Sequence, residues 1–351
     1  MELWLTSVHV PGRAAEMARR AEEYGYDGIG FGDTQNLAPD PYIGLALAAR
    51  ATSTLRLGIR VANPVTRDAA ATAGAIATVQ LESGGRAVLG VGRGDSSVSH
   101  IRGRPAPVSV LASYVEALQG YLGGGPLSAG SGPGPRREGG RPVRPLSWLP
   151  ADLPKVPVDV AATGRRSIAV GARLADAVTV TVGADPERMA ETVRLVRGCD
   201  RPPGAPPLSL GAYVNVVPHP DLAVARDLAK GPAAAYARFS GMAGVAAPGG
   251  RPDDREVYAE VAARYDRRAH GRSGASHTRL LTDDFVSRFA VVGTPGHCVE
   301  RLVELARCGL ERLVIVGPAP DGDPTEVALA LRLLGREVLP GVRAAIGQTM
   351  G

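Results

Sequence analysis

Eight short runs of branched apolar residues alternate along this chain with alanine-rich segments whose apolar residues recur at helical spacing. A strand that is followed each time by a helix favours a parallel sheet, and eight such units in 351 residues favour a (β/α)8 barrel over a doubly wound sheet. We therefore predict one α/β TIM-barrel domain over residues 1–351. Insertions are expected near residues 123–155 and 240–275, where the alternation is interrupted.

The bounds of the predicted elements follow from periodicity and from end signals, such as the N-cap residue Asp40 followed by Pro41 in a first helical turn. Strands are expected at residues 3–8, 27–33, 55–63, 86–92, 156–162, 176–182, 208–218 and 312–318. Helices are expected over residues 12–25, 41–52, 67–82, 106–122, 165–175, 186–198, 220–238, 253–268 and 324–337.

Composition argues against several classes of function. The formal net charge of +5 suits an anionic ligand, but no arginine-rich run is interleaved with aromatic residues, so we expect no nucleic-acid partner. The three cysteines lack CxxC spacing, which disfavours a metal site and disulfides and favours a reducing cytoplasm. The first residues carry no signal-peptide pattern and no apolar run reaches membrane-spanning length. We therefore expect a cytoplasmic protein with no membrane contact.

In barrels of this kind the chemistry lies at the carboxyl ends of the strands. The residues that follow the predicted strands are Ser7 and His9, Asp33 and Thr34, Arg60 to Asn63, Gly92 to Asp95, Thr163 to Arg166, Thr181 to Gly183, and Asn215 and His219. In "GVGRGD" the glycines let a flat ligand approach the backbone closely. This hexapeptide is neither a dinucleotide-binding fingerprint nor a P-loop.

Two of these groups point to an anion site. The segment "ATGRRS" places Thr163, Gly164, Arg165 and Arg166 at the start of a predicted helix, where backbone N–H groups are unsatisfied and the helix dipole is positive. A phosphate suits that position, and Arg93 from the neighbouring strand would close the site from the other side. The alternative is that Thr163 merely caps the helix and that the arginines are solvated.

Four segments of the chain carry a resemblance to a known superfamily: "AARATSTLRLGIRVANPVTRDAAATAGAIATVQLESGGRAVLGVGRGDSS", "VPVDVAATGRRSIAVGARLADAV", "ARFSGMAG" and "DDFVSRFAVVGTPGHCVERLVELARCGLERLVIVGP". In this order they resemble the bacterial luciferase-like flavin and deazaflavin oxidoreductases. Within that superfamily the chain is most similar to coenzyme F420-dependent reductases related to methylenetetrahydromethanopterin reductase. The resemblance covers almost the whole chain except residues 124–150.

The resemblance implies a phosphorylated tricyclic cofactor, coenzyme F420 or alternatively FMN, across the barrel mouth. It also implies a non-prolyl cis peptide bond between Arg60 and Val61, bulging against the central ring, with the Arg60 side chain directed either to the substrate or to the barrel interior. The residues it implies for cofactor binding are Ser7, Arg60, Val61, Gly92, Arg93, Thr163, Gly164, Arg165, Arg166, Val182 and Gly183.

For acid–base chemistry the resemblance implies Asp95, Asp33 and His9. Asp95 matches a carboxylate near the reacting centre, and Asp33 matches an acidic position after strand two. Many monooxygenase-type and sugar-oxidising relatives carry a histidine directly after that acid, where this chain has Thr34. Proton transfer would then fall to a carboxyl group with a pKa raised by burial, or to His9 if its loop folds inward. The alternatives are a capping role for Asp95 and a structural role for His9.

The resemblance therefore implies hydride transfer between the deazaflavin C5 carbon and an activated C=C or C=N bond of a small molecule, or of a modified peptide in secondary metabolism. An FMN-dependent monooxygenase and a non-catalytic flavin-binding barrel are the alternatives. The arginine-rich loop at residues 136–144 is expected to contact an anionic cofactor tail or the substrate, or else to be solvated. Relatives dimerise through helices on one side of the barrel, so we expect a homodimer; the small residues of "AAATAGAIATV" would permit close helix packing there or against the chain's own barrel.

Overall fold

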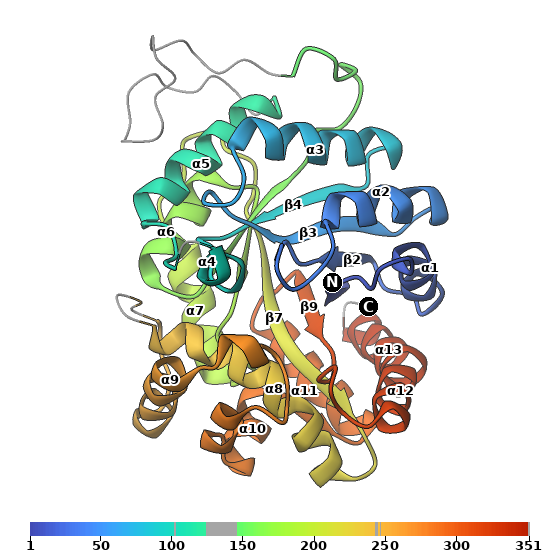
Figure 1. Cartoon of the computed structure of the whole chain (residues 1–351), viewed down its shortest axis with the longest axis vertical. Coiled ribbons are helices and arrows are strands. Elements are labelled where there is room, and N and C mark those ends of the chain that lie inside the picture. Colours follow the sequence, from blue (N-terminus) through green and yellow to red (C-terminus); the bar gives the residue numbers. More distant parts are fainter. Residues whose placement is uncertain (102, 124–145, 243–244, 246, 350–351) are drawn as a thin grey trace.

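Eight parallel strands close into a barrel in the computed structural model, which describes residues 1–101, 103–123, 146–242, 245 and 247–349. These strands are β1 (Glu2–Ser7), β2 (Gly28–Phe31), β3 (Arg56–Ala62), β4 (Ala87–Val91), β5 (Val158–Ala162), β6 (Ala177–Val180), β7 (Ser209–Pro218) and β9 (Arg312–Val316). The sheet closes because β1 pairs with both β2 and β9, and β7 pairs with both β6 and β9. The predicted (β/α)8 barrel and its eight strands are confirmed (Figure 1).

A further short strand, β8 (Val291–Gly293), was not predicted. It pairs with Val216 to Pro218 at the end of β7, beyond the residues of β7 that pair with β9. The strand β7 is ten residues long because it serves both partners. A three-residue strand leaves no alternation in the sequence, and for that reason periodicity missed it.

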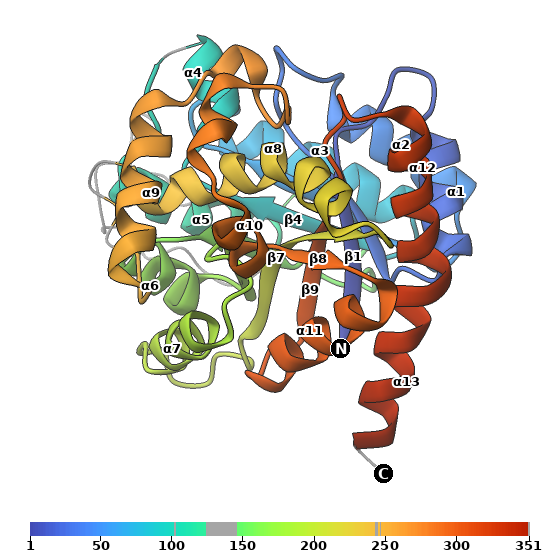
Figure 2. The same ribbon diagram turned by 90° about the horizontal axis from the view of Figure 1, so that it is seen from below.

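Helices surround the barrel on its outside (Figures 1 and 2). They are α1 (Ala14–Glu23), α2 (Pro41–Ala51), α3 (Ala69–Glu82), α4 (Ser96–Ile101), α5 (Val108–Tyr121), α6 (Arg165–Leu174), α7 (Pro186–Arg197), α8 (Leu222–Gly241), α9 (Pro252–Arg264), α10 (Asp283–Phe289), α11 (Pro295–Arg307), α12 (Pro324–Leu333) and α13 (Leu339–Thr349). The Asp40 cap is confirmed, since its carboxylate accepts from the N–H of Tyr42 at 2.9 Å. The sequence missed α4, α10, α11 and α13. Among the described helices, none has the length and apolar character needed to cross a membrane.

The interior of the barrel holds charge as well as apolar side chains. Asp159 on β5 accepts from Arg312 Nη2 at 2.9 Å and forms an ion pair with Arg60, and all three side chains are buried. Glycines leave space for large side chains in the barrel interior. Gly28 on β2 is an example, because a Cβ on this residue would lie 2.5 Å from the ring of Trp4 on the neighbouring strand β1. The small residues of these strands therefore fit a barrel core filled by a few large side chains.

The second insertion supplies structure at one end of the barrel. It contains α9 and a short 3-10 turn, Arg267–Ala269, which leads into His270. Figure 2 places α4 at the end of the barrel opposite the N-terminus, the end at which the strands finish. The loop predicted at 136–144, and most of the insertion near 123–155, lie outside the described residues.

Candidate active site

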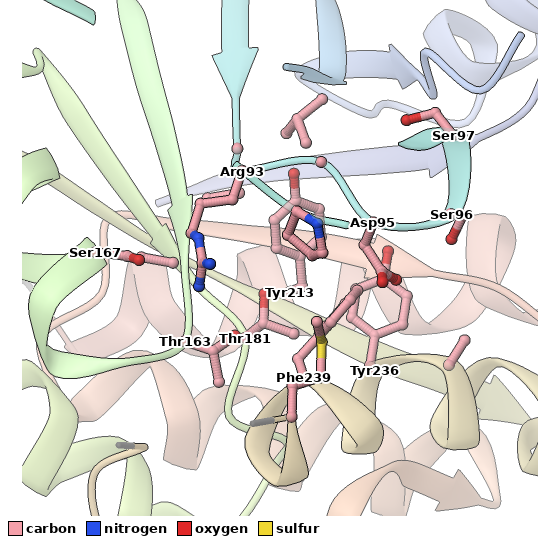
Figure 3. Close-up of a pocket in the computed structure, with 18 of the residues that line it drawn as sticks. Arg93, Asp95, Ser96, Ser97, Thr163, Ser167, Thr181, Tyr213, Tyr236 and Phe239 are labelled. Carbon is pink, nitrogen blue, oxygen red and sulfur yellow. The ribbon is translucent and has the colours of Figure 1, made fainter. Parts of the chain in front are cut away.

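A pocket opens where the strands end, at the mouth of the barrel (Figure 3). Its lining combines the ends of β2 to β6, Tyr213 in the middle of β7, the last turns of α8 and His270 from the second insertion. The lining residues are Asp33, Thr34, Arg60, Val61, Gly92 to Ser97, Pro105, Ala161 to Gly164, Ser167, Thr181, Tyr213, Ala235, Tyr236, Phe239, Met242, Val245 and His270. Eight of the predicted site residues line this pocket: Asp33, Arg60, Val61, Gly92, Arg93, Asp95, Thr163 and Gly164.

Arg93 is held at the end of β4 by its own loop. Its Nε donates to the carbonyl oxygen of Ala106 at 2.6 Å, and the Ala106 N–H donates back to the Arg93 carbonyl at 2.9 Å. Gly94 follows with φ +79°, a backbone conformation that favours glycine. Figure 3 shows the guanidinium of Arg93 directed into the pocket towards Thr163. A fixed cation therefore faces one side of the pocket.

The start of α6 lies on that same side. Its N-cap residue, Gly164, has no side chain to accept from the first-turn N–H groups, and no side-chain cap bond is present. Burial lowers the pKa of Arg93, and the nearby positive charge of Arg166 lowers it further. The fixed cation of Arg93 and the positive charge of Arg166 thus act together beside an uncapped helix start, an arrangement suited to binding an anion.

Arg165 points elsewhere. It lies 3.6 Å from Glu191 in an ion pair and lines a separate, charged depression with α7, not the main pocket. Consecutive side chains on a helix are rotated by roughly 100°, so adjacent arginines face different sides. The structure thus leaves both Arg165 and Arg166 out of the pocket lining: the charge of Arg166 acts on Arg93, while Arg165 pairs with Glu191.

The peptide bond between Arg60 and Val61 is cis, as the resemblance implied. Val61 lines the pocket, and a Cβ on Gly92 would lie 3.1 Å from a methyl group of Val61. The Arg60 side chain turns away from the pocket mouth into the barrel, where its guanidinium carbon lies 4.7 Å from the centre of the Trp4 ring. Of the two directions left open by the sequence, the structure places this side chain in the barrel interior.

Asp33 is buried at the end of β2 and lines the pocket. Burial raises the pKa of this carboxyl group, although Arg67, whose Nε lies 3.1 Å from Asp33 Oδ2, acts in the opposite direction. Gln35 Nε2 donates to the other oxygen at 2.7 Å. The net pKa of Asp33 lies above the ordinary value of 3.8, because the effect of burial outweighs that of its two hydrogen-bond donors.

Asp95 has different surroundings from those expected. Its carboxylate forms an ion pair with Arg238 of α8, a side chain that is only 2% exposed. Asp95 does line the pocket, and Figure 3 shows it beside Tyr236.

The remaining predicted residues do not line the pocket. His9 is buried, with Nε2 at 3.0 Å from the carbonyl oxygen of Asp40 and its ring against Phe31, contacts typical of the structural alternative for this residue. Ser7 donates to the Val8 carbonyl, and Val182 accepts from Arg188 Nη1 at 2.8 Å. Gly183 faces the ring of Phe289, because a Cβ built on this glycine would meet ring atoms of Phe289. Thr181 lines the pocket at the end of β6 in place of Val182 and Gly183.

Several pocket residues escaped prediction. Tyr213 belongs to β7, and Tyr236 and Phe239 belong to α8. His270 lies in an insertion without regular periodicity. The rule that strand ends carry function finds none of these side chains, because they reach the pocket from mid-strand, from a helix and from a long connection.

Comparisons with known proteins agree with this architecture. The family model described as luciferase-like monooxygenase matches residues 3–312. The chain is 27% identical over 337 residues to a 5,10-methylenetetrahydromethanopterin reductase from Methanolobus tindarius, which covers 93% of this chain and 95% of the relative. The structure of coenzyme F420 dependent tetrahydromethanopterin reductase from Methanopyrus kandleri has a TM-score of 0.69 at 23% identity and covers 97% of this chain and 98% of its own. An F420-dependent secondary alcohol dehydrogenase in complex with an F420-acetone adduct has a TM-score of 0.70 at 16% identity, with the same coverage.

Proposed function

The chain belongs to the luciferase-like monooxygenase family, and from this membership we propose that it is a coenzyme F420-dependent oxidoreductase. The proposed reaction is hydride transfer to an activated C=C or C=N bond of a small molecule in the cytoplasm. Support comes from the reductase relative, which aligns over 93% of the chain, and from Thr34, which the resemblance places where many monooxygenase-type and sugar-oxidising relatives have histidine. The observation that carries the proposal is Arg93, which is held by Ala106 and directed into the pocket towards Thr163 at the uncapped start of α6 (Figure 3).

The donor set of the pocket fits a phosphorylated cofactor. Arg93, the N–H groups at the start of α6, and the hydroxyl groups of Thr163 and Ser167 would hold the phosphate. Val61 and Gly92 would lie against the ring system. When bound, coenzyme F420 supplies hydride-transfer chemistry at its C5 carbon, and the protein supplies orientation, exclusion of water and a proton.

We propose Asp33 as the group that holds this proton. Its carboxyl is buried in the pocket wall, and that burial favours the protonated form. The neighbouring Arg67 and Gln35 fix the orientation of its two oxygens. Asp95, as the carboxylate partner of Arg238, would then act by orienting groups on the opposite side of the pocket.

Titration with each cofactor separates the candidate functions. We expect the purified protein to quench F420 fluorescence on binding, and we expect no oxygen-dependent turnover with reduced FMN. FMN binding accompanied by oxygen-dependent turnover would instead establish a monooxygenase. Cofactor binding with no oxidation of the reduced form by a panel of enones, imines and dehydroamino-acid peptides would favour a non-catalytic flavin-binding barrel.

We also propose a homodimer formed through α2 and α3. The α3 side chains that face inward, such as Ile76 and Ala77, pack on the chain's own barrel, so the alternative considered for this helix holds for that face. The outward side carries exposed apolar residues: Ile43 and Leu47 on α2 are 66% and 53% exposed, and Leu81 on α3 is 43% exposed. Such clustered apolar exposure is typical of association surfaces.

Negative charges introduced on this face by substitution are expected to separate the two subunits of the dimer. Light scattering of the wild-type protein should give twice the chain mass of 36.3 kDa, and the double variant Ile43→Glu, Leu47→Glu should give the single-chain mass. Leu222→Glu is the control, because Leu222 is exposed at the start of α8, outside this face. A wild-type protein that elutes as a single chain would contradict the proposed dimer.

A further inference from the structure

One wall of the pocket is aromatic and apolar. Tyr236 and Phe239 of α8 line it together with Met242 and Val245. The ring centres of Tyr213 and Tyr236 are 5.7 Å apart, and those of Tyr236 and Phe239 are 5.9 Å apart with their rings edge to face. Figure 3 shows Tyr236 on the opposite side of the pocket from Thr163 and Ser167. This wall therefore presents ring surface to whatever binds beside the cofactor.

The cation nearest this wall is already neutralised. Arg238 is ion-paired with Asp95, and its guanidinium carbon lies 4.1 Å from the centre of the Tyr265 ring. The arginines that line the pocket within the described part of the chain are Arg60 and Arg93. Arg60 is paired with Asp159, and Arg93 lies on the proposed phosphate side. The aromatic wall thus offers a second ligand no unpaired cation among its described residues.

His270 lines the pocket beside this wall, and its contacts determine which ring nitrogen carries the proton. The Tyr265 hydroxyl oxygen accepts from the Gly271 N–H at 3.3 Å and lies 2.8 Å from His270 Nδ1. A buried hydroxyl needs an acceptor for its own proton, and Nδ1 fills that role, which leaves the ring proton on Nε2. Burial, followed by the charges of Arg238, His100 and His277, lowers the pKa of His270 to about 4. The imidazole is therefore neutral near pH 7.

Ser96 completes the arrangement. Its Oγ lies 3.3 Å from His270 Nε2 and 3.4 Å from Nδ1, so neither ring N–H points at it, and it accepts from Arg238 Nη2 at 3.3 Å. Arg238 is thus its donor, and the hydroxyl proton of Ser96 and the Nε2 proton of His270 are both left for an acceptor in the pocket. Both groups lie at the pocket surface and neither carries charge.

We propose that Ser96 and His270 act as two neutral hydrogen-bond donors, through Oγ–H and Nε2–H, to an uncharged carbonyl oxygen or imine nitrogen of the substrate, while the unsaturated or aromatic body of that substrate packs on Tyr236 and Phe239. The pair selects against anionic substrates such as sugar phosphates, because a second anion would meet aromatic rings and Asp95 and, within the described part of the chain, no unpaired cation. This inference rests on the proposed function for the reaction, but the recognition itself is a binding property of the pocket.

A matched pair of probes tests the selection. Benzalacetone, a neutral aromatic enone, and cinnamate, its near-isosteric carboxylate, are titrated by saturation-transfer NMR with the protein loaded with F420 and without it. We expect benzalacetone to bind at least about 10-fold more tightly than cinnamate, because only the anion lacks a partner. Equal binding of the two probes, tighter binding of cinnamate, or no benzalacetone binding would overturn the proposal.

Substitutions at His270 and Ser96 test which side-chain donors bind the probe. His270→Ala and Ser96→Ala should each weaken benzalacetone binding roughly 5- to 10-fold. His270→Gln, whose amide nitrogen reproduces the Nε2 donor, should retain most of the affinity, and His270→Asn should not. A purely structural role would leave these affinities unchanged or lower both amide variants alike, and either result overturns the assignment. F420 titration of the wild-type protein reports separately on the proposed function.

Discussion

Replacing Arg93 with alanine is expected to weaken F420 binding by roughly 100-fold. The guanidinium would donate charge-assisted hydrogen bonds to the phosphate, and the loss of two such bonds corresponds to about 3 kcal/mol. Arg93 is already held in place by Ala106, so its orientation costs little on binding. The dissociation constant, measured from the quenching of F420 fluorescence, is the readout.

Two neighbouring arginines are compared with Arg93 in the same experiment, and Arg165 is the control. Arg166→Ala should also weaken F420 binding, because it removes positive charge close to Arg93 and to the proposed phosphate position. Arg165→Ala should leave the dissociation constant within about 2-fold of the wild-type value, since Arg165 pairs with Glu191 outside the pocket. If Arg165→Ala weakened binding as much as Arg93→Ala, a general attraction of positive charge would replace the specific site that we propose.

Removing the carboxylate of Asp159 is expected to destabilise the fold by about 3–5 kcal/mol. Asp159 accepts from Arg312 at 2.9 Å and from Thr179 at 2.7 Å, and it is paired with Arg60 as well. Asp159→Ala therefore leaves two buried guanidinium groups without a counter-ion. Urea unfolding followed by circular dichroism at pH 7 measures the change.

A surface pair provides the comparison for Asp159. Glu16 pairs with Arg13 on α1, where both side chains are more than half exposed, so Glu16→Gln should leave the unfolding midpoint unchanged. An Asp159→Ala protein with the same midpoint as wild type would show that water reaches the interior and solvates the two arginines.

Asp159 and its two arginines also make the stability of the fold depend on pH. Burial acts to raise the pKa of Asp159, but Arg312 and Arg60 more than offset it, and the pKa lies below the ordinary value of 3.8. The unfolded chain therefore binds the proton more readily than the folded one. The stabilisation by Asp159 is fully present above about pH 4 and is lost as pH falls through the lower, folded-state pKa.

The sequence predicted the barrel because strand and helix alternation is a local signal repeated along the whole chain. It also predicted Arg93, Asp33 and Thr163 at the pocket, since the carboxyl end of a strand fixes where the next few side chains lie. His9 satisfied the same rule and yet packs against Phe31, because a strand end does not determine how its loop folds.

What the sequence lacked was the partner of each pocket residue. Asp95 is paired with Arg238, which lies 143 positions later on α8, and Ser96 meets His270 across a separation of 174 residues. The first contact depends on how α8 packs at the barrel mouth and the second on how the second insertion folds there, so neither leaves a local pattern.

The most direct test compares F420 with its phosphate-free deazaflavin core in equilibrium titrations of the wild-type protein. If the pocket holds a phosphorylated deazaflavin through Arg93 and the start of α6, F420 should bind at least about 10-fold more tightly than the core. Equal dissociation constants for the two compounds, or binding of neither, would contradict the proposal that this pocket binds the cofactor through its phosphate.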